Sequence, residues 1–243
     1  MRFVPVLLSL LPVAAQAVSL SVPQLADGAT WKTTLTVFSR SSRTTQVEIL
    51  FFGDDGKPLA LPIVGKGPVA TVQANLGPFD SATFETEGTS STLLVGWAHV
   101  ESDNEVGGVS VFRQRVPGSQ DTEGAVPFTA LGTAVISSFD NTGGFITGVA
   151  MVNHGFGPVT LNIGFTAEGG QSLTPGTLVL NPKYHTSFVL AERFPQVAGK
   201  RGTMQVTGVT YQGLVEGSIS VLGLRFNPRG SFTTLPVFSS IMR

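Results

Sequence analysis

Hydrophobic and polar residues alternate with a period of two along most of the chain. Residues 31–37 place Trp31, Leu35 and Val37 on one parity, and residues 47–52 place Val47, Ile49 and Phe51 at every second position. Such alternation is typical of β-strands that bury one face. The segment Gly53-Asp-Asp-Gly56 separates two such stretches, and Asp and Gly tolerate the positive φ angles of a tight turn. The same reasoning predicts further strands over 82–86, 92–100, 108–116, 186–190, 203–210 and 218–226.

This pattern occurs twice in the chain. Eight residues in the first half match eight in the second half at a constant spacing of 114 positions. The matched sets are Trp31, Leu35, Val37, Val47, Ile49, Phe51, Gly56 and Leu59, and Phe145, Val149, Met151, Leu161, Ile163, Phe165, Gly170 and Leu173. Further on, Phe84 matches Phe188 at a spacing of 104, and Arg115 matches Arg225 at a spacing of 110. These matches indicate a tandem duplication.

Each unit has about 110 residues, which is the size of one sandwich domain. A short stretch of small residues near 130–133 suits the border, so we assign a first repeat to 18–131 and a second to 132–243. The fold class predicted is all-β, with two tandem antiparallel immunoglobulin-like β-sandwich domains. Equivalent strand orders are expected in the two repeats, with the matched phenylalanines buried. A helical turn is expected only near 190–194, in the second repeat.

The first 17 residues have the three-part pattern of a secretory signal peptide. Met1-Arg2 is a short positive region, residues 3–13 are mostly apolar, and Ala15-Gln16-Ala17 has small residues at the −3 and −1 positions of a cleavage site. The apolar run is too short to span a membrane. We therefore predict cleavage before Val18 and a mature protein that is secreted, periplasmic or on the cell surface, without a membrane span.

Four motifs carry a resemblance to a family. They are Trp-x-Thr-x-Leu-x-Val from Trp31, Phe-Phe-Gly-Asp-Asp-Gly-Lys-Pro-Leu from Phe51, Gly-Pro-x-x-Ser-Ala-Thr-Phe from Gly77, and Gly-Trp-Ala-x-Val from Gly96. Their order resembles uncharacterised tandem immunoglobulin-like β-sandwich modules of secreted bacterial proteins. The resemblance covers residues 31–100 well and residues 145–226 more loosely. It implies a fold and a compartment, and no activity.

Composition and motifs exclude several functional classes. The formal net charge of −1 leaves no basic excess to neutralise a nucleic-acid backbone. The chain has no cysteine, so cysteine nucleophiles and disulfides are impossible. It also lacks the nucleophile elbow of α/β-hydrolases and the phosphate-binding loop of nucleotide hydrolases. We therefore expect neither catalysis nor a cofactor.

The histidines and one acidic loop are the possible metal ligands. His99, His154 and His185 have no paired spacing, so each is interpreted as a solvated residue on a turn or strand face. The segment Glu101–Glu105 holds four carboxylate or amide side chains but lacks the regular spacing of a calcium loop. We expect a hairpin tip without a bound metal, and calcium binding stays open as the alternative.

Aromatic residues are the remaining candidates, because carbohydrate-binding proteins stack sugars on exposed rings. Trp31 and Trp97 share the parity of apolar neighbours, and both are expected in the core, Trp97 on the inner face of its sheet. Tyr184 and Tyr211 are expected in loops. Together with His185 they form a weak candidate ligand-binding site.

These observations favour a non-catalytic extracellular module with a structural, adhesive or interaction role. Its partner would be an extracellular protein or a glycan. The alternative is a module that binds carbohydrate or another extracellular ligand through the loops of the second repeat. A hydrolase acting on polysaccharide is a third hypothesis, which would require two carboxylates facing one cleft.

Overall fold

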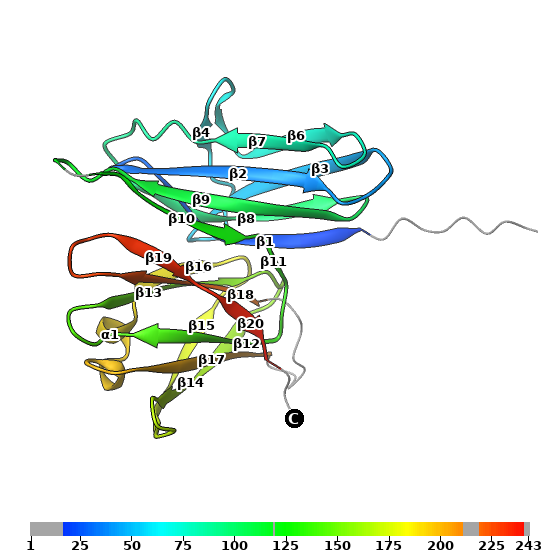
Figure 1. Cartoon of the computed structure of the whole chain (residues 1–243). Coiled ribbons are helices and arrows are strands. Elements are labelled where there is room, and N and C mark those ends of the chain that lie inside the picture. The colour runs from blue at the N-terminus through cyan, green and yellow to red at the C-terminus, as the bar shows by residue number, and fades with distance from the viewer. Residues whose placement is uncertain (1–16, 119, 211–218, 241–243) are drawn as a thin grey trace, which may run out of the picture.

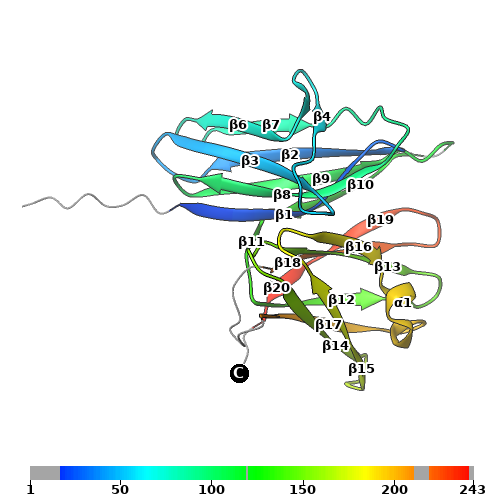
Figure 2. The same cartoon turned by 180° about the vertical axis from the view of Figure 1, so that it is seen from behind.

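The protein consists of two β-sandwiches stacked on each other, as Figures 1 and 2 show from opposite sides. The computed structural model describes residues 17–118, 120–210 and 219–240. The predicted signal peptide, apart from Ala17, and the candidate residue Tyr211 lie outside the described residues.

The first repeat forms a sandwich of a five-stranded and a four-stranded antiparallel sheet. Across the five-stranded sheet the order is β11 (Thr129–Ala130), β1 (Val18–Asp27), β8 (Leu94–Ser102), β3 (Thr45–Gly53) and β6 (Thr71–Leu76). Across the four-stranded sheet it is β10 (Thr122–Pro127), β9 (Val106–Gln114), β2 (Trp31–Ser39) and β7 (Ser81–Glu85). A separate hairpin consists of β4 (Leu61–Ile63) and β5 (Gly67–Val69).

The second repeat has the same strand orders. Its five-stranded sheet runs β20 (Val237–Ser239), β12 (Ala134–Asp140), β17 (Arg201–Thr210), β14 (Val159–Ala167) and β15 (Ser172–Leu180). Its four-stranded sheet, called the docking sheet below, runs β19 (Phe232–Leu235), β18 (Ile219–Phe226), β13 (Ile146–Asn153) and β16 (His185–Val189). The prediction of two immunoglobulin-like sandwiches with equivalent strand orders is confirmed.

In the part of the chain that the structure describes, helix is confined to the region near 190–194, where the sequence predicted a helical turn, and to the residues that follow directly. The helix α1 (Leu190–Arg193) and the 3-10 helix η1 (Pro195–Val197) follow β16 in the second repeat. Among the described residues, no helix is long and apolar enough to cross a membrane.

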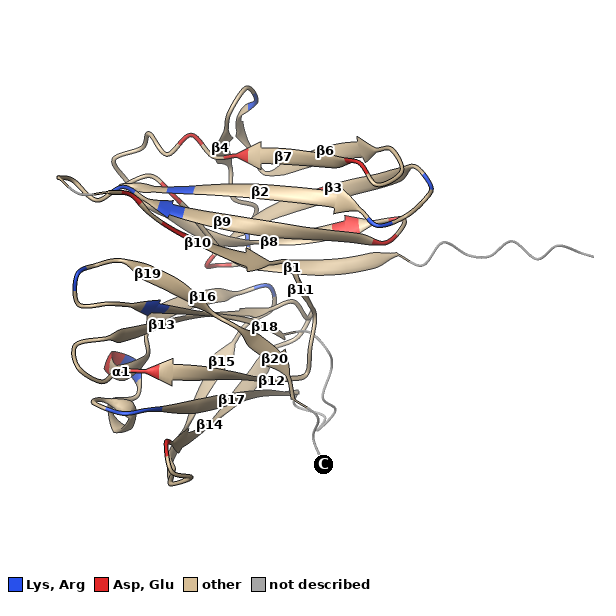
Figure 3. Cartoon of the chain, in the orientation of Figure 1, with Lys and Arg blue, Asp and Glu red and all other residues tan. Residues whose placement is uncertain are grey.

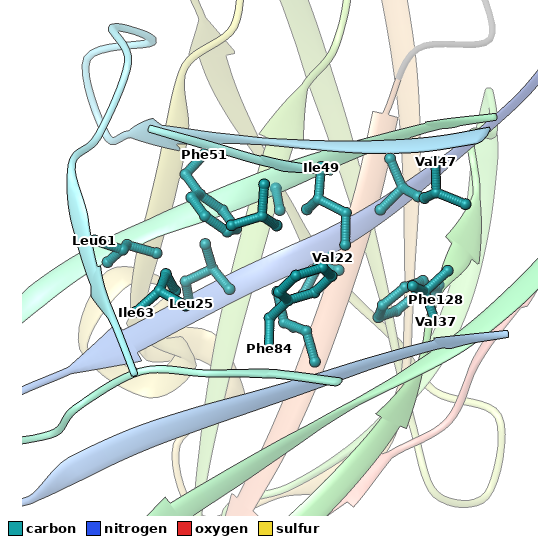
Figure 4. Close-up of a cluster of buried hydrophobic side chains, with 14 of the residues drawn as sticks. Val22, Leu25, Val37, Val47, Ile49, Phe51, Leu61, Ile63, Phe84 and Phe128 are labelled. Carbon is teal, nitrogen blue, oxygen red and sulfur yellow. The ribbon is translucent and has the colours of Figure 1, made fainter. Parts of the chain in front are cut away.

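Alternation along the strands explains the two hydrophobic cores. In Figure 4 the side chains of the first core, including Phe51, Ile49 and Phe84, point into the space between the sheets. Phe51 and Phe165 are almost completely buried at equivalent positions, as predicted. Phe188 departs from the prediction because it is only half-buried. It lies on β16, at the edge of the docking sheet, where one side of the ring lacks a neighbouring strand.

A buried threonine demonstrates the duplication at the level of single hydrogen bonds. The hydroxyl of Thr33 donates to the carbonyl oxygen of Ala26 at 2.8 Å and accepts from the Ala26 amide at 3.1 Å. Thr147 makes the same two bonds to the backbone of Asp140, each 2.9 Å long. In both repeats the hydroxyl therefore links the end of the first strand (β1 or β12) to the start of the second strand (β2 or β13).

The predicted match of Arg115 to Arg225 is wrong. Leu35 pairs with Ser110 in the first repeat, and its equivalent Val149 pairs with Gly223 in the second. β9 and β18 therefore correspond at a spacing of 113 residues, not 110. Both strands are apolar and rich in Gly and Val, so their side-chain pattern alone could not determine the register, which depends on pairing with β2 and β13.

Candidate functional site

The docking sheet packs its outer face against β1, β8 and β10 of the first repeat, and we call this contact the junction (Figure 1). One half of the junction is an apolar cluster drawn from both repeats. Its members are Phe112, Val126, Ala150, Leu222 and Phe232, with Trp31, Leu224 and Phe226 packed against them. The ring centroids of Trp31 and Phe232 are 5.3 Å apart. Trp31 is thus half-buried between the repeats, not inside the core of the first repeat as predicted.

Trp97 lies at the polar half of the junction. It is completely buried, but Ala98 and Val100 mark the inner face of β8, and Trp97 points away from that core. Its ring stacks on Phe52 with centroids 4.6 Å apart, and its Nε1 donates to the Lys183 carbonyl oxygen of the second repeat at 3.0 Å. As predicted, Trp97 and Val95 lie on the same face of β8. This is the outer face of the sheet, and the second repeat buries Trp97 there, whereas the prediction placed it in the first core.

His154 is buried beside Trp97, with the two ring centroids 4.6 Å apart. Its Nε2 is 2.9 Å from the hydroxyl of Ser220, which in turn lies 2.8 Å from the hydroxyl of Ser21 in the first repeat. The ring of His99 is 5.7 Å away. The prediction of a solvated turn histidine is therefore wrong for His154, because the other repeat covers it.

His185 connects the two repeats through both of its ring nitrogens. Nδ1 is 2.7 Å from Oδ1 of Asp54, and Nε2 is 3.0 Å from Oε1 of Gln24. The His185 amide also donates to the Asp54 carbonyl oxygen at 3.2 Å. The His185 side chain has no exposed surface, so its interpretation as a solvated residue is also wrong. All three histidines of the chain belong to the junction.

Burial shifts the pKa values of three titratable groups in the polar half of the junction. Burial lowers the pKa of His154 well below its usual 6.5, and the nearby His99 and Lys183 lower it further. Burial also lowers the pKa of His99, against the opposing effect of Glu101, which lies 3.1 Å away. The pKa of Lys183 is lowered by burial as well. Nδ1 of His154 has no hydrogen-bond partner among the described residues.

The three residues predicted to bind a ligand do not form an open platform among the described residues. Tyr184 is half-buried and packs against the second core. His185 is enclosed in the junction, and Tyr211 lies outside the described residues. The turn Asn181–Tyr184 reaches the first repeat through Lys183, whose φ of 63° is a left-handed conformation. A ligand-binding role for these residues stays a prediction.

Side chains of the acidic loop at Glu101–Glu105 are hydrogen-bonded to the protein backbone. Oδ1 of Asp103 accepts the Gln46 amide at 2.9 Å, and the Ser102 hydroxyl donates to the Asn104 carbonyl oxygen at 2.7 Å. Within the described ranges, no group of three His, Cys, Asp or Glu side chains could hold a metal ion. The expectation that this loop binds no calcium stays a prediction.

Repeat-to-repeat differences explain why only one of the two equivalent four-stranded sheets docks. The strand pairings establish which positions correspond. The docking sheet has Gly148, Ala150, Phe226 and Phe232 where the first repeat has Thr34, Thr36, Arg113 and Glu123. Figure 3 shows the resulting charges on β2 and β9 of the first repeat. The sequence signal that could have located the junction is this difference between the repeats, in which polar and charged residues of one sheet are replaced by small and aromatic residues at the equivalent outward-facing positions of the other.

Comparisons with known proteins leave the family open. No family model and no curated protein matches the chain. A solved structure that it matches is a segment of two fibronectin type-III domains from chicken tenascin, with 12% sequence identity over 91% of this chain and 99% of that one. The TM-score of 0.14 is too low to carry any argument.

Proposed function

We propose that this protein is a non-catalytic extracellular module in which two β-sandwiches act as one rigid structural or interaction unit. The observation that carries the proposal is a set of buried polar groups at the junction. His154, His185, Ser21 and Trp97 make their hydrogen bonds across or along the junction, so these groups hold the repeats together. Buried, mutually bonded groups of this kind orient domains and do not present a nucleophile to a substrate.

Rigidity is the first testable consequence. Small-angle scattering of the whole chain should match one compact stacked pair, and Trp97→Ala should give a more extended particle because it removes a stacked ring and a donor. Thr36→Ala is the matched control, because Thr36 lies on β2 in the four-stranded sheet of the first repeat and faces away from the junction. It should leave the scattering curve unchanged. A wild-type curve that requires two independently moving sandwiches would contradict the proposal.

Export is the second part of the proposal. Val18 begins β1 and pairs with Ser102, so cleavage before Val18 would leave the first sandwich intact. Mass spectrometry of the exported protein should show Val18 as its first residue. An intact N-terminus found only in the cytoplasmic fraction would overturn the assigned compartment.

Non-catalytic action is tested with defined polysaccharides such as cellulose, chitin and peptidoglycan. We expect no release of soluble sugar from any of them during prolonged incubation. Measurable, saturable hydrolysis would overturn the proposal and favour the hydrolase hypothesis.

One observation favours glycan binding as a second candidate function. Phe156 is 92% exposed, and Nζ of Lys183 lies 4.8 Å from the centre of its ring, beside the turn that contains Tyr184. An exposed ring next to polar groups is the usual platform for a sugar. If the protein binds one of these polysaccharides, Phe156→Ala should abolish the binding, whereas Phe79→Ala, at an exposed ring of the first repeat, should not.

A further inference from the structure

The junction contains an apolar cavity of about 270 Å³, which we call the junction cavity. Trp31, Leu93 and Phe112 line it from the first repeat. Phe188, Leu222 and Phe226 line it from the second. Leu93 is 41% exposed, so the cavity has an apolar border toward solvent.

Two small residues of the docking sheet create this space. Gly148 and Ala150 follow each other on the outer face of β13, where the first repeat has Thr34 and Thr36. A Cβ atom on Gly148 would lie 3.2 Å from Cε2 of Phe226, so one methyl group fits only with a small displacement of that ring. Larger side chains at these two positions would occupy the cavity, as close-packed interiors normally do.

The lining determines what the cavity can accept. It contains no charged side chain, and its polar side chains are Gln24 and Ser187. Oε1 of Gln24 is already bonded to His185, and its Nε2 donates to the Leu25 carbonyl oxygen at 3.2 Å. A charged ligand would find no oppositely charged partner among these side chains, whereas an apolar ligand needs none.

Its volume limits the size of the ligand. The space corresponds to roughly nine water-sized volumes, and an apolar cavity of about 150 Å³ is known to take up benzene. We propose that the junction cavity binds a small uncharged apolar molecule, about the size of two fused aromatic rings or a medium-length acyl chain. Tyr184 does not line this site, and the proposal does not depend on the proposed structural role.

Calorimetric titration of the full chain with naphthalene tests the proposal, with naphthalene-2-carboxylate as the charged analogue. We expect one saturable site for naphthalene and an affinity for the carboxylate weaker by about tenfold or more. Ala150→Leu, which fills the cavity, should reduce naphthalene affinity by about tenfold or more. The matched control is Thr36→Leu, which adds a leucine at the equivalent position in the four-stranded sheet of the first repeat. This variant should bind naphthalene like wild type.

Gly148→Ala keeps the test decisive if Ala150→Leu does not fold, because it adds a single methyl group to the same wall. It should weaken naphthalene binding measurably while the far-UV circular dichroism stays native. Absence of saturable binding to wild type, or unchanged affinity in a folded cavity-filling variant, would overturn the proposal. Flotation with phosphatidylcholine vesicles that is lost in Ala150→Leu would also overturn it, in favour of a membrane lipid tail.

Discussion

Protonation of His154 should destabilise the folded protein as the pH falls below 6.5. In the unfolded chain this histidine takes up a proton near its usual pKa of 6.5, whereas burial, His99 and Lys183 hold its folded pKa well below that value. The unfolded state therefore binds more protons in this range, and folding stability is lost as the pH decreases. Well above pH 6.5 both states are neutral at this position, and the stability no longer depends on the protonation of His154.

The size of the effect follows from the same linkage. While His154 stays neutral in the folded state, the free energy of unfolding falls by about 1.4 kcal/mol for each pH unit below 6.5. Between pH 6.5 and about pH 5 the loss approaches about 2 kcal/mol, a large part of the roughly 5–15 kcal/mol typical of a domain. His99, whose pKa is also lowered, adds to the loss in the same direction.

Urea unfolding at a series of pH values between about 7.5 and 5 measures this slope. The variant His154→Gln is the matched control, because an amide can still bond to the Ser220 hydroxyl but does not titrate. It should lose clearly less stability over the same interval. An equal pH dependence in wild type and His154→Gln would refute the assignment of the effect to this buried ring.

Three further predictions concern single contacts. Trp97→Phe keeps the stacked ring but leaves the Lys183 carbonyl oxygen without its donor, so thermal or urea unfolding should show a loss of about 1–3 kcal/mol; a loss near zero would mean that this hydrogen bond adds no stability. Thr33→Val and Thr147→Val each remove the two hydrogen bonds between the threonine hydroxyl and the backbone, and each should lower the free energy of unfolding in urea by about 1–3 kcal/mol. A large loss in only one repeat would contradict the equivalence of the two threonines. Millimolar calcium should leave the melting temperature unchanged, because the loop Glu101–Glu105 lacks the regular ligand spacing of a calcium loop and Oδ1 of Asp103 already accepts the Gln46 amide, and a clear rise would assign a metal site to that loop.

Much of the fold could be predicted from local pattern, and little of the junction could. Alternation correctly placed Phe51 and Phe165 in their cores, because which face of a strand is buried follows from a period of two. The same rule failed to describe Trp97 and His154. It separates one face of a strand from the other, but it does not say whether the outer face meets solvent or another domain.

The sequence by itself determined the fold class, the duplication and most of both cores, because each depends on residues close in the chain or repeated at a constant spacing. Only the tertiary structure showed that Trp97 and the three histidines gather at the junction and that Gly148 and Ala150 leave a cavity there. These contacts join residues from different repeats. Their formation depends on how two complete surfaces fit together, which no local periodicity encodes.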